Sequence, residues 1–519
     1  MRGLSFEAVG EIAPADPNRV DIACFVGLVA RRKPAALDWA RDPVRAWLDA
    51  HGWSGAGGRP AGELVDLLDV PAPLESWDDF DRRYAWDARP LDAAGAFTAT
   101  SYLGAAVRSF FAQGGRRCYV VRVGDPPPLV APKTQRRALL DKLLPREPGQ
   151  PMPVDRSTWR GLGHLFGLPD VAFVSLPDLP DLVALDRDAP PVEPPAPPPF
   201  VEQFVECSTG ETPDPKDRLA RLFAAPRCDL EAYGVWVEAA QRAALLVSRQ
   251  AREVMLLAGI PLPAPGLVTT SSAHAAAERD LLGFMREQGW LKPLSSPTLK
   301  DRGLATAFLQ LTFPWLKTRA SDGLPEQLEN PEGALAGLLA RNALLRGTYS
   351  SAAALSVPGV YDVEPRLPQL GGDDVLEDHV TLFGPTVRGL RLLGDSTTSD
   401  DPSHRSAGVS RLVAAIVRAA RTLGEHVAFE PSSPRLWRHI VKILSSLLNG
   451  LWNAGALDGA TAGEAYSVRC DASTTTQQDI DAGRVITEVS FNAAATIDRI
   501  TVVLVMTEGG RVSLAEAAA

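Results

Sequence analysis

The fold is decided by the stretch from Phe429 to Glu508. It contains the segment LWRHIVKILSSLLNGLW (436–452), the turn NAGALDGA (453–460) and the apolar segments VITEV (485–489) and ITVVLVM (500–506). In the first segment apolar side chains recur at three- and four-residue steps, at Leu436, Ile440, Ile443, Leu447 and Leu451. One face of a helix over 436–452 is therefore apolar and must pack against another part of the protein. Gly455 follows, where the C terminus of a helix often needs a residue tolerant of positive φ.

The hydrophobic period changes to two after this helix. Val485, Thr487, Val489 and Phe491 lie on one side of an extended chain, which is typical of a half-buried strand. The segment 500–506 is almost wholly apolar and fits a more central strand. The predicted order is helix, glycine turn, strand, loop, strand, strand.

This order resembles the C-terminal domain of the tail sheath proteins of contractile phage tails and related contractile injection systems. The resemblance lies in the tryptophan helix, the turn W-x-x-G-x-L-x-G (452–459), the strand VRCD (468–471) and the loop DIDAGR (479–484). Two further segments resemble the same family, YLGAAVRSFFAQGGRRCYVVRV (102–123) and NPEGALAGLLARNALLRGTY (330–349). Segment 330–349 is similar to the family's Pro-x-Gly-x-x-Ala-Gly helix followed by Arg-Gly.

The chain also departs from the family's pattern. The family usually opens with a Pro-Gly-Val-Tyr-like arm, whereas this chain has LSFEAVG (4–10). The segment GLRLLG (389–394) stands where the family has a strand ending in Trp-Gly-Ala-Arg-Thr, and it lacks both the tryptophan and the arginine.

Composition agrees with a large globular protein. A chain of 519 residues, 45% of them hydrophobic and 22% charged, is expected to form roughly two to four domains. The formal net charge of −10 offers no general attraction to nucleic acid or to an anionic membrane. Five scattered cysteines have no zinc-ligand spacing, which favours buried thiols in a reducing compartment. The first eleven residues lack the features of a signal peptide, and no stretch reaches the length of a membrane span. We therefore expect folding in the cytoplasm.

The resemblance implies a mixed α/β (α+β), multidomain fold whose sheath core is built from the N- and C-terminal parts with a middle insertion. The expected parts are an arm (1–19), the N-terminal part of the core (20–124), an outward-facing insertion (125–330) with a proline-rich linker (189–200), a central sheath region (331–428) and a C-terminal sheath domain (429–519). The insertion is expected to decorate the core, with helices over 230–258, 279–288 and 303–311 and a strand over 171–176.

Motifs of catalysis and ligand binding are missing from the sequence. It contains no phosphate-binding loop, no Gly-x-Ser-x-Gly elbow and no His-Glu-x-x-His helix. The glycine-rich segment 161–167 favours a tight turn over a nucleotide site. For the seven isolated histidines, surface or structural roles outweigh metal ligation by roughly ten to one. The acidic loop 371–374 is interpreted as a solvated turn, with a cation site as the minor alternative. We therefore assign no catalytic residue, no metal ligand and no cofactor.

By resemblance, the protein is expected to be a structural sheath subunit that polymerises into a contractile helical sheath around an inner tube. The expected partners are copies of itself, an inner tube protein, baseplate and cap proteins, and other sheath paralogues, with no nucleic acid and no direct membrane insertion. The particle is expected to be a phage tail or a phage tail-like injection particle, including one released outside the cell. Energy stored at assembly would drive contraction, so that no nucleotide is needed.

The residues assigned to assembly lie in the arm and in two strands taken to be sheet edges: Leu4, Phe6, Val9, Val485, Thr487, Val489, Ile500, Val502 and Leu504. A helix face, Leu436, Ile440, Leu447 and Trp452, is assigned either to assembly or to the subunit's own core. Two alternatives remain open. The short arm leaves room for a paralogue that caps or starts the sheath, and the segment 125–330 for an enzyme with an unrecognised site.

Overall fold

The structure is a computed structural model that describes residues 20–34, 36–54, 58–95, 97–144, 151–187, 220–268, 280–295, 302–367, 376–427, 430–494, 499–507 and 512–515. The arm residues 1–19, the linker 189–200 and the acidic loop 371–374 lie outside these ranges. The chain divides into two compact units. The large unit comprises residues 20–345 and 351–410, and the C-terminal unit comprises residues 346–350 and 411–519.

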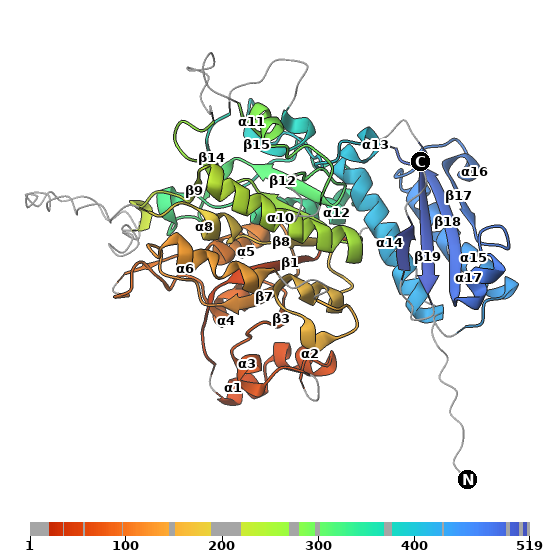
Figure 1. Cartoon of the computed structure of the whole chain (residues 1–519), viewed down its shortest axis with the longest axis horizontal. Coiled ribbons are helices and arrows are strands. Elements are labelled where there is room, and N and C mark those ends of the chain that lie inside the picture. The colour runs from red at the N-terminus through yellow and green to blue at the C-terminus, as the bar shows by residue number, and fades with distance from the viewer. Residues whose placement is uncertain are drawn as a thin grey trace, which may run out of the picture. The chain divides into compact units, whose positions relative to one another are not determined.

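A mixed eight-stranded sheet forms the centre of the large unit (Figure 1). Its five parallel pairs join neighbouring strands from β7 to β15, and an antiparallel strand closes each edge. In spatial order the strands are β16 (Gly389–Leu392), β15 (Thr381–Thr386), β12 (Leu309–Phe313), β10 (Met255–Gly259), β8 (Phe173–Ser175), β1 (Ala23–Leu28), β7 (Cys118–Gly124) and β3 (Pro71–Leu74).

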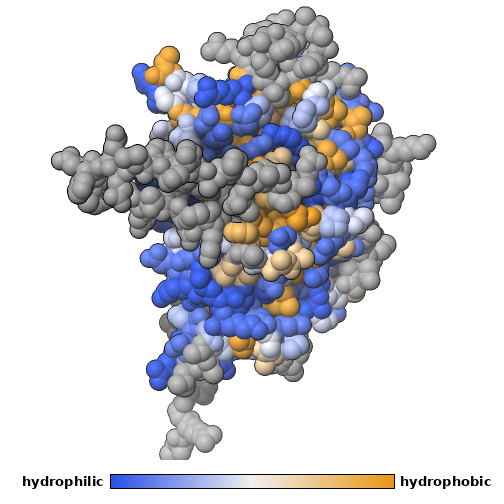
Figure 2. All heavy atoms as spheres, turned by 90° about the vertical axis from the view of Figure 1, so that its left-hand side faces the viewer, coloured by the Kyte–Doolittle hydropathy of each residue, from blue (hydrophilic) through white to orange (hydrophobic). Residues whose placement is uncertain are grey.

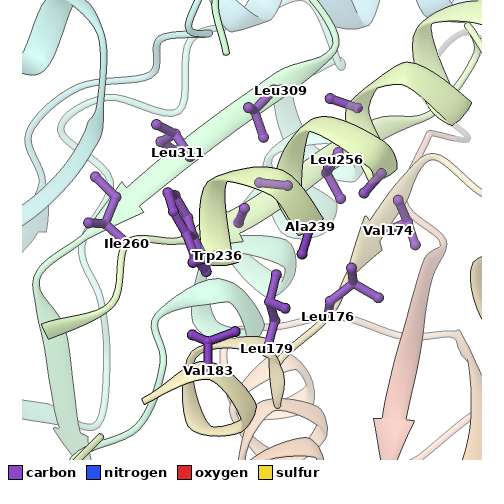
Figure 3. Close-up of a cluster of buried hydrophobic side chains, with 14 of the residues drawn as sticks. Val174, Leu176, Leu179, Val183, Trp236, Ala239, Leu256, Ile260, Leu309 and Leu311 are labelled. Carbon is purple, nitrogen blue, oxygen red and sulfur yellow. The ribbon is translucent and has the colours of Figure 1, made fainter. Parts of the chain in front are cut away.

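Helix α10 (Leu230–Gln250) covers one face of this sheet. Figure 3 shows Trp236 and Ala239 of α10 among apolar side chains of β8, β10, β12 and α8 (Leu179–Val183). Side chains of successive strand residues point to opposite faces. Phe25 therefore lies on the other face from Cys24, and it contacts Phe110 of α5 (Tyr102–Ala112) with ring centroids 5.5 Å apart. Helices thus cover both faces, as a parallel sheet requires.

Helix α12 (Glu332–Arg346) packs unusually close to α5. A Cβ atom placed on Gly333 would lie 2.2 Å from the carbonyl oxygen of Ala106, and one placed on Gly337 would lie 2.4 Å from that of Phe110. The two glycines stand four residues apart on one helix face and let the two backbones approach. The glycines of the Pro-x-Gly-x-x-Ala-Gly segment therefore have a packing role.

Several predicted elements of the large unit are confirmed, and two are wrong. The strand predicted over 171–176 contains β8, and the helix predicted over 279–288 contains α11 (Leu281–Glu287). The segment 330–349, which is similar to a family helix, contains α12. Residues 255–258 and 309–311 were predicted to be helical, but they lie in β10 and β12. The segment 125–330 thus supplies three neighbouring strands of the central sheet, so that its interpretation as a decoration of the core is also wrong.

The C-terminal unit is an antiparallel sheet with helices. Its strands, in the order β17 (Tyr466–Arg469), β18 (Arg484–Asn492), β19 (Arg499–Thr507) and β20 (Val512–Ala515), follow the chain. Helix α14 (Ala407–Val427) leads into the unit, and α15 (Pro434–Asn453), α16 (Ala462–Ala465) and α17 (Gln477–Asp481) complete it. The predicted order of helix, turn and strands is confirmed.

Helix α15 begins and ends as its sequence predicts. The Ser433 hydroxyl accepts a hydrogen bond from the Leu436 amide at 3.3 Å, and Pro434 occupies the first turn. Gly455 has a φ of +78° just after the helix. The buried side chains of the helix are Leu436, Ile440, Leu444, Leu447, Leu448 and Leu451. Ile443 is only half-buried, because the apolar stripe turns toward Leu444 and Leu448.

Candidate assembly surfaces

Strands β18 and β19 are interior strands of the C-terminal sheet, so their prediction as sheet edges is wrong. Every residue of β18 pairs with β19, and β19 pairs on its other side with β20. Val489, Thr487 and Leu504 are fully buried, and Val485 is 9% exposed. At Ile500 and Val502 the structure describes only the backbone of β19. The described side chains, those of Val485, Thr487, Val489 and Leu504, therefore lie in the core of the subunit, and the outer strands of the described sheet are others.

The outer strands of the described sheet are β17 and β20. Strand β17 pairs only with residues 488–491 of β18. The other half of β18 is covered by a loop, because the Thr475 hydroxyl accepts a hydrogen bond from the Ile486 amide at 3.0 Å and lies 3.2 Å from the Ile486 carbonyl oxygen. On the opposite side β20 pairs with residues 503–506 of β19. Within the described residues, both outer strands leave one edge without a partner strand.

The helix face Leu436, Ile440 and Leu447 belongs to the core of the C-terminal unit. All three side chains are at most 8% exposed, which supports the core alternative for this face. Trp452 is half-buried, and its Nε1 donates a hydrogen bond to the Gly459 carbonyl oxygen at 3.0 Å. Trp452 therefore fixes the glycine turn that follows the helix.

The outer face of α15 is strongly basic. Arg435, Arg438, His439 and Lys442 are exposed or half-buried, and residues 434–453 contain no aspartate or glutamate. None of these three arginine and lysine side chains forms an ion pair with another described residue. A concentrated positive face on a chain with a net charge of −10 favours contact with an acidic partner.

The crevice in which parallel sheets usually bind ligands is filled by the protein itself. That crevice lies at the carboxyl ends of β1 and β8, where the chain crosses from one side of β1 to the other. The Asp178 carboxylate accepts hydrogen bonds there from the amides of Leu28, at 2.7 Å, and Leu103, at 3.3 Å. Leu103 lies in the first turn of α5, so this carboxylate occupies the position at which a bound anion would meet the helix.

A second buried carboxylate lies at the carboxyl ends of the next two strands, β8 and β10. Glu332, at the start of α12, accepts hydrogen bonds from the Gly259 amide at 2.6 Å, the Asn330 side-chain amide at 2.8 Å and the Leu176 amide at 3.1 Å. The Ser175 hydroxyl is a further donor. Glu332 is 1% exposed and joins β8 and β10 to α12.

Two of the buried acids, Asp178 and Glu329, have strongly raised pKa values. Burial and, to a smaller extent, nearby Asp181 raise the pKa of Asp178 to about 7, against the opposing effect of its amide donors. Burial also raises the pKa of Glu329 to about 8. One Glu329 oxygen accepts hydrogen bonds from the hydroxyls of Ser109, at 2.6 Å, and Thr318, at 2.9 Å, while the other has no partner. Such shifts mark catalytic groups when they face a cleft, but these acids are at most 4% exposed.

One histidine and four cysteines are buried inside the protein. His164 is buried and lies 3.0 Å from the Asp69 carboxylate, and burial lowers the pKa of His164. Cys24, Cys118, Cys228 and Cys470 are free and buried. Among the residues that the structure describes, no group of three or more histidine, cysteine or acidic side chains is arranged to hold a metal ion. In the same part of the chain no helix has both the length and the hydrophobicity of a membrane span.

Apolar side chains also reach the surface. Figure 2 shows one face of the large unit, on which hydrophobic residues gather near the middle between hydrophilic areas. Among the large apolar residues that the structure leaves exposed, Val387 is the most extreme, with a relative exposure of 104%. It lies at the tip of the β15–β16 hairpin.

Comparison with known proteins identifies the fold. No family profile matches the sequence, and no curated protein matches it either. A chain in the six-fold symmetrised structure of the anti-feeding prophage (AFP) baseplate is 17% identical, with a TM-score of 0.54 over 96% of this chain and 97% of that chain. A chain in the structure of the AFP helical sheath in its contracted state is also 17% identical, with a TM-score of 0.52 over 96% and 97%. Over 96% of its length, this chain thus shares the mixed α/β fold of these AFP chains.

Proposed function

We propose that this chain, whose fold is that found in a contractile sheath, is a structural subunit that polymerises into a helical sheath around an inner tube and contracts to drive the tube through a target envelope. The observation that carries this proposal is the likeness to the contracted AFP sheath along 96% of this chain. Because the likeness covers nearly the whole of both chains, it includes the C-terminal sheet as well as the large unit. We infer no catalytic role.

Polymerisation needs a surface that binds a neighbour without closing on itself. The unpaired edges of β17 and β20 offer such surfaces, because an extended segment from another subunit can add a strand to either one. We propose that the arm residues Leu4, Phe6 and Val9, which lie outside the described part of the chain, supply this strand. The buried residues of β18 and β19 then act indirectly, by holding the two outer strands in place.

The basic face of α15 is the proposed contact with the inner tube. Reversing two of its charges, in a variant carrying Arg438→Glu and Lys442→Glu, should leave the subunit folded because neither side chain is buried. We expect sheath recovery on tubes to fall and to become more sensitive to salt. A control with Lys33→Glu and Arg116→Glu changes the same charge on exposed residues of the large unit. Equal losses in both variants would contradict a specific role of α15.

Baseplate and cap proteins are the other proposed partners, with assembly in the cytoplasm before incorporation into a phage tail or a phage tail-like particle. Contraction in this proposal uses energy stored at assembly. The filled crevice at Asp178 agrees with a mechanism that needs no nucleotide.

A second candidate is a sheath paralogue that starts the sheath at the baseplate. The observation in its favour is the match to a chain of the AFP baseplate, with a TM-score of 0.54. The two candidates differ in stoichiometry, because a starter forms one layer and a main subunit forms the length of the tube. Mass spectrometry of purified particles distinguishes them by the ratio of this chain to the tube protein.

Negative-stain electron microscopy tests the main proposal. The purified protein is imaged alone and after co-expression with the products of neighbouring genes, with and without deletion of residues 1–9. We expect striated hollow tubes that vanish on deletion. Monodisperse particles under every condition would overturn the proposal of a sheath subunit.

A further inference from the structure

The tip of the β15–β16 hairpin presents one apolar side chain on a structured turn. Thr386 pairs with Gly389 across the hairpin, which leaves Val387 and Arg388 as a two-residue loop. The Thr386 hydroxyl donates a hydrogen bond to the Gly389 carbonyl oxygen at 2.7 Å and accepts one from the Arg388 amide at 3.3 Å. Gly389 has a φ of +96°, which the turn requires. Val387 therefore projects fully into solvent from a loop whose backbone is held.

The C-terminal unit contains an apolar cavity that matches such a side chain. The cavity has a volume of about 170 Å³ and lies between the end of α14, the start of α15, and the strands β18 and β19. Its apolar lining includes Val427, Leu436, Ile440, Ile480, Val485 and Met506. Since a water molecule takes about 30 Å³ in the liquid, this space equals about six waters and can hold a branched aliphatic side chain.

Charge at the cavity complements charge on the hairpin. Glu430 lines the cavity and is exposed, and it forms no ion pair with another described residue. Arg388, the neighbour of Val387, is exposed and is likewise without an ion-pair partner among the described residues. The exposed Val387 side chain next to Arg388 is thus complementary to the apolar cavity next to Glu430.

We propose that Val387 of one subunit inserts into this cavity on a neighbouring copy, with Arg388 of the first subunit against Glu430 of the second. The inference rests on the proposed function, because it requires a second copy. The hairpin belongs to the large unit and the cavity to the C-terminal unit, so the contact is heterologous. Each subunit can offer its hairpin to one neighbour and its cavity to another, which lets the contact repeat along a filament. The hairpin contact would be separate from strand addition at β17 and β20.

Charge and polarity variants test the contact. Val387→Asp and Arg388→Glu should each raise the protein concentration needed for tube formation at least tenfold, while circular dichroism stays unchanged because both side chains are exposed. The combination of Arg388→Glu with Glu430→Arg should restore assembly relative to either single variant. Val154→Asp is the matched control, since Val154 is also exposed, at 74%, and lies elsewhere in the large unit.

Disulfide cross-linking tests whether the Val387 hairpin of one subunit contacts the cavity of another subunit. Two differently tagged forms, one with Val387→Cys and one with Pro431→Cys beside the cavity, are assembled together and oxidised. We expect a disulfide-linked species carrying both tags, with each variant alone as the control for native cysteines. A disulfide formed only within one chain that carries both substitutions would overturn the inference.

The outcomes separate this inference from the proposed function. If the unmodified protein forms tubes and Val387→Asp forms them at the same concentration, the hairpin contact is wrong and the sheath function stands. If the unmodified protein never assembles with its tube, both are wrong.

Discussion

Replacing Gly333 by alanine should destabilise the large unit by about 2 kcal/mol. In an open helical site this change stabilises a helix by about 1 kcal/mol. At Gly333 the added methyl group would lie 2.2 Å from the Ala106 carbonyl oxygen and 2.5 Å from the Ala106 Cα atom. Both are backbone atoms of α5, so that a whole helix must move to relieve the contact. Overpacking of this kind costs up to about 3 kcal/mol, which exceeds the propensity gain.

Urea unfolding followed by tryptophan fluorescence measures this effect, because Trp236, Trp290 and Trp315 are buried in the large unit. With an m-value of about 3–4 kcal/mol/M for a unit of this size, the midpoint should fall by about 0.5 M. The matched control is Gly62→Ala in α3 (Ala61–Val65), where an added Cβ meets nothing within 4 Å. Adding Gly337→Ala should cost less than a second full increment, since one shift of α12 relieves both contacts. A Gly333→Ala midpoint at or above that of the unmodified protein would refute this account of the α5–α12 packing.

Three further predictions concern single residues. Glu332→Gln should lower the free energy of unfolding by about 2–3 kcal/mol, measured by urea unfolding, since the new amide group must face donors that now bind a carboxylate. Glu329 has a folded-state pKa of about 8, above its unfolded value, so the folded state holds more protons and stability should fall as pH rises from about 4.5 to 8. Urea midpoints across this range should show a smaller fall in Glu329→Gln; equal falls would contradict the assignment. Gly455→Ala should lower the free energy of unfolding of the C-terminal unit by about 1–2 kcal/mol, measured by thermal unfolding, because alanine is strained at a φ of +78°. Gly455→Asn should lower it less, since asparagine tolerates positive φ better. Equal losses from alanine and asparagine would count against that reason.

The elements that the sequence predicts best are those with one polar face. Helix α15 has a clear stripe of leucine and isoleucine bounded by a serine cap and a glycine turn, and β18 alternates strictly between buried and half-buried residues. In both, the periodicity itself records which side meets the core. The errors fall where no polar face exists. Strand β10, with the sequence MLLAG, is buried at all five positions, and a short buried run of this kind fits equally well as the end of the alanine-rich α10.

The prediction that β18 and β19 are edge strands failed for a different reason. Alternation in β18 fixes which side chains face the core, but a strand's neighbours depend on pairing with segments far along the chain. The sequence therefore contained no signal that the Thr475 loop and β17 share one side of β18. The buried carboxylates were missed because most of the groups that donate hydrogen bonds to Asp178 and Glu332 lie more than seventy positions away along the chain. The basic face of α15 was readable, as four basic residues among twenty without an acid, and it should have been recognised.

The carboxylate at the end of β1 also constrains how this sequence can change. A Cβ atom on Gly27 would lie 2.2 Å from the Asp178 carboxylate, and one on Gly259 would lie 1.9 Å from the Asn330 side-chain oxygen. A side chain at either glycine would displace its polar neighbour from this position, and a displaced or substituted Asp178 would leave the Leu28 amide without its acceptor. In each pair, Gly27 with Asp178 and Gly259 with Asn330, a substitution at one position is therefore tolerated best when the other position changes too. We expect the order of substitutions at these pairs to be strongly epistatic, so that descendants retain the filled crevice long after the surface of the subunit has diverged.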